Sequence, residues 1–196
     1  MSVRGIGLGL LLLVVGCGAP AAKSADGAPS GAASEAERWL PLTNATVFSY
    51  VTTDEVGATG IYVMDISRPR PALAELKVAG KVFRRCITKD GIQAATGGGY
   101  VLRSPLSADA KWQGEFGQVS VKSMSRTIKV PAGSFGDCIE TLESVTTPDY
   151  TKSATSVFCP GVGMVYYKVE GEQDGVTLSQ KLELKSFGPR FVAGAL

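Results

Sequence analysis

The chain has 196 residues, 44% of them hydrophobic, and its 20 Lys and Arg residues nearly balance its 18 Asp and Glu residues. This near balance, without a basic cluster interleaved with aromatic residues, argues against nucleic acid as a partner. The chain contains no histidine, which excludes Ser-His-Asp and Cys-His nucleophilic mechanisms and ordinary imidazole acid–base chemistry.

Residues 1–16 have the pattern of a secretory signal peptide. Arg4 is the only charge among them, and the apolar run Ile6–Val15 follows it. A helix that spans a membrane needs about 20 apolar residues, and this run is roughly half as long. It is also diluted by Gly7 and Gly9. We therefore expect export rather than a membrane span.

The signal segment ends in Val14-Val15-Gly16-Cys17. These residues resemble the lipobox of bacterial lipoproteins, in which an aliphatic residue and two small ones precede an invariant cysteine. The resemblance implies that the Cys17 thiol receives a diacylglyceryl group and that cleavage follows Gly16. The new amine is then usually acylated, with palmitate as the expected chain. Two or more acyl chains anchor a protein stably to a membrane.

The residue after the cysteine bears on localisation. In lipoproteins of bacteria with two membranes, an Asp at this position commonly retains the protein on the inner membrane. Gly18 stands there in this chain and resembles the outer-membrane sorting pattern instead. The resemblance implies a lipid-anchored protein of the cell envelope, on the outer membrane where the organism has two membranes.

A segment rich in Ala, Gly, Ser and Pro follows the lipobox. Residues 17–37 include no aromatic residue, Leu, Ile or Val, so they cannot bury enough apolar surface to offset their ordering entropy. We expect a flexible tether there, with a short helix at Ala32–Arg38 as the alternative. A single domain is expected over 38–190, with a C-terminal tail over 191–196.

The domain is patterned as β-strands almost throughout. In Val176–Lys185 apolar and polar residues alternate with a period of two, which is typical of a strand with one wet face. Further strands are expected at Val47–Thr53, Gly60–Ser67, Leu73–Val78, Lys81–Lys89, Ile92–Thr96, Tyr100–Arg103, Gln118–Val130, Asp137–Thr146, Thr155–Cys159 and Met164–Glu170. At Lys89–Ile92, Asp-Gly supplies the positive φ angles of a tight hairpin turn. The pattern predicts an all-β antiparallel meander, as a sandwich, a barrel or a half-barrel.

Three cysteines lie in the expected domain, and an exported domain permits disulfides. A hairpin centred between Pro148 and Asp149 places Cys138 opposite Cys159, because the two cysteines are equidistant from that centre. Directly opposite residues of antiparallel strands are within disulfide range, so we predict a Cys138–Cys159 bridge. Cys86 is then left over, and a small buried side chain is favoured there over a reactive thiol or an intermolecular bridge.

Two motifs of the domain are Val130-Pro131-Ala132-Gly133-Ser134-Phe135 and Pro160-Gly161-Val162-Gly163-Met164-Val165. They resemble motifs of a widespread group of bacterial envelope lipoproteins that has no assigned activity. Trp39–Leu42 with Phe48–Tyr50 is similar to that group's entry strand, although Asn44-Ala45-Thr46 replaces its commoner Gly-Asn pair. The resemblance implies a fold like that of periplasmic lipid and lipoprotein carriers, in which a curved antiparallel sheet wraps an apolar cleft. Both motifs are expected to form turns or bulges.

No motif in the domain points to catalysis, and no zinc-like or Cys-x-x-Cys spacing implies a metal or cofactor. The neighbouring carboxylates Glu140 with Glu143, and Glu170 with Glu172, are expected to lie on solvated strand faces rather than to form catalytic pairs. We therefore expect a protein that is not an enzyme. A His-free enzyme, for example one with a Ser/Lys dyad, stays as the last alternative.

Two non-catalytic functions stand ahead of it. The leading hypothesis is a membrane-anchored envelope lipoprotein whose β domain has a structural or protein-binding role. The alternative is a carrier or sensor of an apolar ligand, such as a lipid, held in a concave cleft of the sheet. The expected partners are thus the membrane, through the N-terminal lipid, and another envelope protein or a lipid. The side chains expected to line the cleft are Leu178, Leu182, Leu184, Phe158, Val165 and Val169.

Overall fold

The structure is a computed structural model that describes residues 34–173 and 175–191. The predicted signal peptide, the predicted lipidated Cys17 and the C-terminal residues 192–196 lie outside these ranges. The described chain contains one short helix, α1 (Glu35–Trp39). Its strands are β1 (Thr46–Asp54), β2 (Thr59–Arg70), β3 (Leu73–Val78), β4 (Lys81–Thr88), β5 (Gly91–Ala94), β6 (Tyr100–Arg103), β7 (Lys111–Gln113), β8 (Gln118–Val130), β9 (Gly133–Thr146), β10 (Tyr150–Cys159), β11 (Gly163–Gln173) and β12 (Val176–Pro189).

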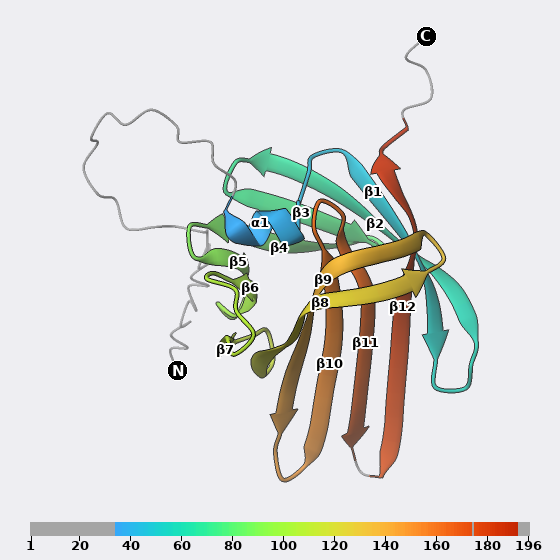
Figure 1. Cartoon of the computed structure of the whole chain (residues 1–196). Coiled ribbons are helices and arrows are strands. Elements are labelled where there is room, and N and C mark those ends of the chain that lie inside the picture. The colour runs from blue at the N-terminus through green and yellow to red at the C-terminus, as the bar shows by residue number, and fades with distance from the viewer. Residues whose placement is uncertain (1–33, 174, 192–196) are drawn as a thin grey trace, which may run out of the picture.

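All these strands belong to one sheet, in the order β6-β5-β4-β3-β2-β1-β12-β11-β10-β9-β8-β7. Strands β1 to β6 and strands β7 to β12 each pair in sequence as an antiparallel meander, and the pairing of β1 with β12 joins the two halves. The sheet curls until its edges approach each other, which gives a nearly closed barrel (Figure 1). The predicted all-β antiparallel meander is confirmed, and of the predicted shapes the barrel is the one found.

The sheet has a seam where its edge strands β6 and β7 meet without a ladder between them. The indole Nε1 of Trp112 on β7 donates a hydrogen bond of 3.0 Å to the carbonyl oxygen of Tyr100 on β6. Next to this bond the backbones of Gly99 and Gly114 are in direct contact. Backbone contact and side-chain contacts thus close the barrel in place of a strand pair.

The predicted strand bounds agree with β3, β6 and β8 and differ elsewhere. β10 begins at Tyr150 rather than Thr155, β9 begins at Gly133 rather than Asp137, and β7 has no counterpart among the predicted strands. β7 has only three residues, which is too short for a period of two to be recognised. The longer β10 matters most, because its first residues line the candidate site described below.

The hairpin of β9 and β10 has the predicted register. Ile139 pairs with Phe158 and Glu140 with Val157, which places Cys138 opposite Cys159. These two cysteines form a disulfide with Cα atoms 4.2 Å apart, and both are buried. The predicted bridge is confirmed. Cys86, on β4, is buried as expected, but it is not a free thiol, so the expectation of a left-over cysteine is wrong.

The first sequence motif forms the turn of the hairpin between β8 and β9. Val130 pairs with Gly133, so Pro131 and Ala132 make a two-residue turn, as predicted. Several register shifts bend these long strands, and the hairpin crosses the outer side of the strands from β10 to β12 (Figure 1). The backbone N–H of Ala132 donates a 2.8 Å hydrogen bond to the carbonyl oxygen of Leu184, which fixes the tip of the hairpin on β12.

The second motif forms the turn between β10 and β11. Cys159 pairs with Gly163, and Gly161 and Gly163 have positive φ angles of 73° and 108°, which glycine adopts without strain. The backbone N–H of Gly161 donates a 2.8 Å hydrogen bond to the carbonyl oxygen of Arg38. The turn therefore also holds the end of α1 in place.

The hairpin at Lys89–Ile92 is present, with one difference from the prediction. Thr88 pairs with Gly91, so Lys89 and Asp90 are the turn residues, and Gly91 alone among them has a positive φ, of 139°. A Cβ on Gly91 would lie 2.1 Å from the carbonyl oxygen of Leu102. Gly91 is therefore required by the close passage of β6 as well as by its own backbone angle.

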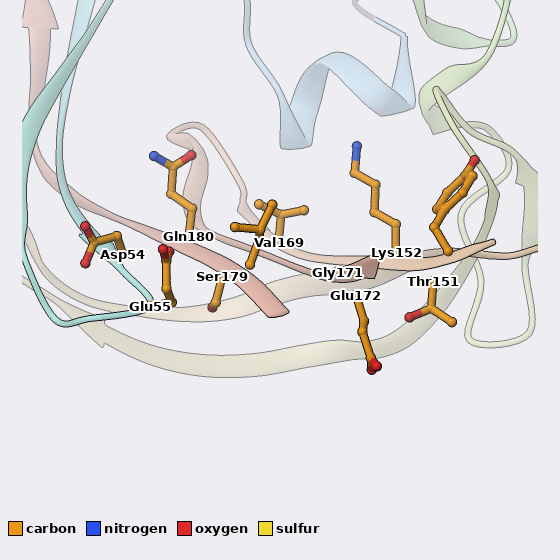
Figure 2. A pocket seen from close by; sticks show the side chains of 11 residues that line it. Asp54, Glu55, Thr151, Lys152, Val169, Gly171, Glu172, Ser179 and Gln180 are labelled. Carbon is orange, nitrogen blue, oxygen red and sulfur yellow. The ribbon is translucent and has the colours of Figure 1, made fainter. Parts of the chain in front are cut away.

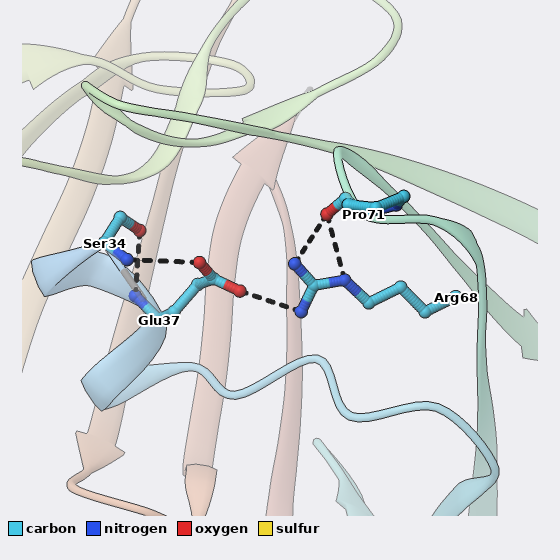
Figure 3. Close-up of polar contacts among 4 residues, drawn as sticks. All are labelled: Ser34, Glu37, Arg68 and Pro71. Atoms are coloured by element: carbon cyan, nitrogen blue, oxygen red, sulfur yellow. Dashed lines mark hydrogen bonds and ion pairs between the residues drawn. The ribbon is translucent and has the colours of Figure 1, made fainter. Parts of the chain in front are cut away.

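Helix α1 covers one end of the barrel (Figure 1). It begins with a capping box, in which the Ser34 hydroxyl accepts from the Glu37 N–H and the Glu37 carboxylate accepts from the Ser34 N–H. Glu37 also forms an ion pair of 2.8 Å with Arg68, whose guanidinium donates to the carbonyl oxygen of Pro71 (Figure 3). These contacts and the burial of Ala36 show that residues 34–37 belong to the domain, where we predicted tether. The alternative of a short helix is the one found.

Candidate functional site

The structure divides the six residues of the predicted cleft into two groups. Leu182, Leu184, Phe158 and Val165 are buried in the hydrophobic core, where they pack with Trp39 and other core side chains. Leu178 is 60% exposed and Val169 is half-buried. The prediction of one cleft lined by all six is therefore wrong, because core side chains fill the end of the barrel that α1 covers.

A cleft is present at the opposite end, on the side of the sheet that faces α1 (Figure 2). This is the inner face, since Leu178 of the lining is four residues from the buried Leu182 on β12. Its volume is ≈ 430 Å³. Val169 and Leu178 lie in its lining, so two of the six predicted residues are brought together there. The complete lining is Asp54, Glu55, Tyr150, Thr151, Lys152, Val169, Gly171, Glu172, Leu178, Ser179 and Gln180.

The cleft has a simple cause in the cross-strand rows of the inner face. Lys152 pairs with Gly171, and Gly171 pairs with Leu178, so these three positions form one row across β10, β11 and β12. Side chains in such a row stand on the same face of the sheet. Gly171 contributes no side chain to the middle of the row. The neighbouring row places Val169 beside Gln180, and its side chains form the wall of the resulting hollow.

The polar side chains of the cleft lining differ in the side of the sheet to which they point and in their hydrogen bonds. Lys152, Val169 and Gln180 point to the side of the sheet that faces α1, whereas Glu172 and Thr151 point away from it (Figure 2). The Asp54 carboxylate accepts hydrogen bonds from the N–H groups of Val56 and Ala58, at 3.1 and 2.8 Å. Asp54 is therefore engaged in the turn between β1 and β2.

The Lys152 ammonium lies over an aromatic ring. Its Nζ is 4.2 Å from the ring centroid of Phe116, which is within the range of a cation–π contact. Among the described residues, Lys152 forms no ion pair, whereas Lys168 and Lys181 on the next two strands pair with Glu170 and Glu183. Lys152 is thus a half-buried cation that has no carboxylate at ion-pair distance in the described chain.

Phe116 belongs to a loop, residues 114–117, that two strands hold against the barrel interior. The Glu143 Oε1 on β9 accepts hydrogen bonds from the N–H groups of Phe116 and Gly117, at 2.6 and 2.9 Å. From the other half of the sheet, Arg85 on β4 forms an ion pair of 2.9 Å with Glu115. The loop is therefore fixed from two sides, which positions the Phe116 ring beside Lys152.

Three tyrosines of the inner face have raised pKa values. The pKa of Tyr167 is raised to about 12, chiefly by burial and to a smaller extent by the Glu115 and Glu143 carboxylates. Burial also raises the pKa of Tyr62 and of Tyr50 above the ordinary tyrosine range. The Tyr50 hydroxyl donates a 2.9 Å hydrogen bond to the carbonyl oxygen of Met164. These phenols are therefore neutral at physiological pH and serve as packing and hydrogen-bonding groups.

The carboxylate pairs considered from the sequence do not converge on a common point. Glu140 and Glu143 lie on opposite faces of β9, since they are three residues apart in an unshifted part of the strand. Glu140 forms an ion pair of 3.1 Å with Arg126. Glu170 pairs with Lys168 at 2.7 Å. Among the residues that the structure describes, no group of three or more His, Cys, Asp or Glu side chains is placed to hold a metal ion.

Sequence reasoning missed Lys152, which it placed outside any strand. The available signal was the run Tyr150-Thr151-Lys152-Ser153-Ala154, in which Lys152 shares a strand face with Tyr150 and Ala154. If the predicted strand had been extended back to the turn at Tyr150, Lys152 would have been recognised as a lysine on an otherwise uncharged strand face. Gly171, the other residue that creates the cleft, was not distinguishable from an ordinary strand glycine.

No protein-family model matches the chain, and no curated protein matches it. Among solved structures, a candidate lipoprotein from Parabacteroides distasonis aligns over 76% of this chain and 98% of its own, with 14% identity and a TM-score of 0.44. A candidate exported protein with a YmcC-like fold from Bacteroides fragilis aligns over 76% and 98%, with 13% identity and a TM-score of 0.46. These values carry no functional argument. Within the described ranges, no helix is long and apolar enough to cross a membrane.

Proposed function

We propose that this protein is a lipid-anchored protein of the bacterial envelope whose β domain is a non-catalytic binding module. The lipobox-like Val14-Val15-Gly16-Cys17 supports the anchor, and Gly18 supports the outer membrane where two membranes exist. The Cys138–Cys159 disulfide fits an oxidising compartment outside the cytoplasm. The ligand is a small molecule with an apolar part, bound in the cleft at the open end of the barrel.

The observation that carries the binding role is the cleft itself. Its volume of ≈ 430 Å³ falls within the range of roughly 300–1,000 Å³ that is usual for small-molecule sites. Val169 and Leu178 provide apolar surface in it, and Gly171 leaves the space between Lys152 and Leu178 open. This observation supports ligand binding over the structural or protein-binding role that leads on sequence alone.

A non-catalytic role is supported by the state of the polar side chains around the cleft. The Asp54 and Glu143 carboxylates already accept backbone hydrogen bonds, and Lys152 lies over the Phe116 ring. These contacts give Asp54 a structural role in the β1–β2 turn and Glu143 one in the loop of residues 114–117. The absence of histidine from the sequence removes the commonest acid–base group.

A second candidate function is protein binding at the same open end. Val176 and Leu178 are 58% and 60% exposed near the tip of the β11–β12 hairpin, and exposed apolar side chains that gather at one place favour a docking surface. Because Leu182, Leu184, Phe158 and Val165 pack in the core, the interior as a whole is not an empty cavity. In the first candidate function a small molecule enters the cleft, whereas in the second a partner protein contacts only the rim of the cleft.

The anchor is tested by expressing the full chain in a bacterium with two membranes. We expect the wild type to enter the detergent phase on Triton X-114 partition and to carry a diacylglyceryl-sized mass on Cys17. Cys17→Ser should lose this mass and remain in the aqueous phase. A wild-type protein that is wholly aqueous, or whose mature N-terminus is another residue, contradicts the anchor.

The cleft is tested by photolabelling the full chain, held in phosphatidylcholine nanodiscs, with a neutral dodecanol that carries a diazirine. We expect crosslinks on peptides from β10, β11 and β12. Gly171→Leu, which fills the hollow, should reduce this labelling several-fold. Gly188→Leu is the matched control, because no atom lies within 4 Å of a Cβ at Gly188. Equal labelling of all three proteins would exclude the cleft and favour protein binding at the rim.

A further inference from the structure

Lys152 differs from the lysines of the neighbouring strands in both its face and its partners. Lys168 and Lys181 stand opposite each other on β11 and β12 and pair with Glu170 and Glu183. Lys152 stands on the inner face of β10, in the lining of the cleft, and points to the side that faces α1 (Figure 2). Lys152 thus differs from these two lysines in that it lies in the cleft and forms no ion pair in the described chain.

None of the three acidic residues of the lining, Asp54, Glu55 and Glu172, forms an ion pair with Lys152 in the described chain. Glu55 follows Asp54 and lies beside it, away from Lys152 (Figure 2). Asp54 adjoins Gln180 across the β1–β12 pair, so three strand spacings, about 14 Å along the sheet, separate it from β10. Charges at that separation are largely screened at physiological ionic strength, where the Debye length is about 8 Å. Glu172 points to the opposite side of the sheet from Lys152 (Figure 2). Glu143 pairs with Ala154 on the same face, but its Oε1 accepts hydrogen bonds from the N–H groups of Phe116 and Gly117, and it forms no ion pair with Lys152 in the described chain. The Lys152 ammonium is therefore available to an added anion.

The surroundings of Lys152 also strengthen its attraction for an anion. The ammonium is half-buried, and one side of it faces the Phe116 ring at 4.2 Å. Reduced contact with water lowers the effective dielectric constant and increases the strength of a charge-assisted hydrogen bond. Val169 and Leu178 lie in the same lining, so apolar surface continues from the cation along the cleft.

We propose that the cleft takes a single-chain amphiphile with an anionic head, a carboxylate or a phosphate. The head is bound by the Lys152 ammonium, and the chain lies against Val169 and Leu178 in the space that Gly171 leaves open. This inference rests on the proposed binding function and names its ligand class. Charge complementarity at one end and apolar surface beyond it distinguish such a ligand from a neutral oil and from a cationic surfactant.

The test is a competition between amphiphiles that share one chain length. The full chain in nanodiscs is photolabelled with the neutral diazirine dodecanol in the presence of dodecanoate, dodecyl phosphate, dodecanol or dodecyltrimethylammonium. We expect dodecanoate and dodecyl phosphate to suppress cleft labelling at concentrations about tenfold lower than dodecanol does, as one charge-assisted hydrogen bond predicts. Inorganic phosphate and acetate, which lack the chain, should not compete at the same concentrations.

Variants identify the residue responsible. Lys152→Gln should remove the preference for the anionic heads while the labelling itself persists, and Lys152→Arg should keep the preference. Lys168→Gln is the matched control on the outer face of β11, and it should leave the preference unchanged.

The outcomes separate the two proposals. Labelling of the cleft with equal competition by all four amphiphiles, or a preference that survives Lys152→Gln in a folded protein, overturns the anionic ligand and leaves the binding function standing. Absence of cleft labelling in the wild type overturns both. Competition by inorganic phosphate or acetate alone, as strong as that by the chain-bearing anions, overturns the amphiphile and assigns the site to a free anion.

Discussion

A Cβ added to Gly99 would lie 1.8 Å from the carbonyl oxygen of Gly114, so these two glycines bring the loops at the two sides of the barrel seam into backbone contact. No side chain fits between them without a shift of the backbone, since real Cβ contacts are never this short. The seam has no strand ladder, and this contact therefore carries much of its closure together with the Trp112–Tyr100 hydrogen bond.

We expect Gly99→Ala to lower the free energy of unfolding by about 1–3 kcal/mol, the usual cost of overpacking. Urea denaturation followed by tryptophan fluorescence measures this, and Trp112 at the seam should report it directly. Gly188→Ala is the control, because nothing lies within 4 Å of a Cβ there. Equal stability of the two variants would show that the seam is open in solution.

Leu182 and Leu178 offer a matched pair on one face of β12. Leu182 is 5% exposed and packs in the core, while Leu178 is 60% exposed at the cleft. We expect Leu182→Ala to lower the free energy of unfolding by about 2–5 kcal/mol through a core cavity, and Leu178→Ala to change it by less than about 0.5 kcal/mol. Leu178→Ala should instead weaken photolabelling of the cleft. A reversed order of the two stabilities would contradict the depth assigned to the core.

Glu143 is expected to stabilise the loop of residues 114–117 through its two backbone hydrogen bonds. Glu143→Ala leaves both N–H groups without this acceptor and should lower the free energy of unfolding by about 2–3 kcal/mol, whereas Glu143→Gln keeps a neutral acceptor and should cost about half as much. Glu172→Ala, on an exposed side chain, is the control. Chemical denaturation at neutral pH distinguishes the three variants, and three equal stabilities would contradict the anchoring role.

Tyr167 should make the stability fall at alkaline pH. Its pKa is raised from 10.0 to about 12, so between these values the unfolded chain releases a proton that the folded chain retains. Folding is then opposed as the pH rises, by up to about 1.4 kcal/mol per pH unit for this group. Below pH 10 the effect is absent. Unfolding in urea at pH 9, 10 and 11 should show a steeper loss for the wild type than for Tyr167→Phe, and parallel losses would refute the raised pKa.

The sequence predicted the elements in which a local signal and the tertiary structure agree. Cys138 and Cys159 are equidistant from the Pro148–Asp149 turn, and this symmetry predicted the register of the whole hairpin. Register can change only by whole residues, so one correct pair determines all the others. The Pro131 turn and the alternation in β12 were readable for the same reason. Each of these features depends only on residues that are close together in the sequence.

The sequence did not predict how far the hydrophobic core extends along the barrel. Alternation states on which face Leu178, Leu182 and Leu184 lie, but it does not state how far along the strand the core extends. That limit is set by α1 and by the loop of residues 114–117, which come from distant parts of the chain. Helix α1 is too short for a helical period, and its one sequence signal was the capping box of Ser34 and Glu37. The contact of Lys152 with Phe116 likewise joins residues that no local pattern connects.

The pairing of β1 with β12 has a consequence for the order in which the molecule is assembled. A chain is synthesised from its N-terminus. One edge of β1 therefore stays unpaired until β12, the last strand, of 14 residues, has been synthesised. To pair β1 with β12, the chain must close a loop that spans nearly the whole domain. The entropy of this closure is lost before the stabilising contacts between the two strands form, and folding is therefore slow. A chain that stops before residue 176 would keep the edges of β1 and β11 unpaired, and open edges of this length recruit other strands. Premature termination should therefore yield aggregates rather than a smaller folded domain.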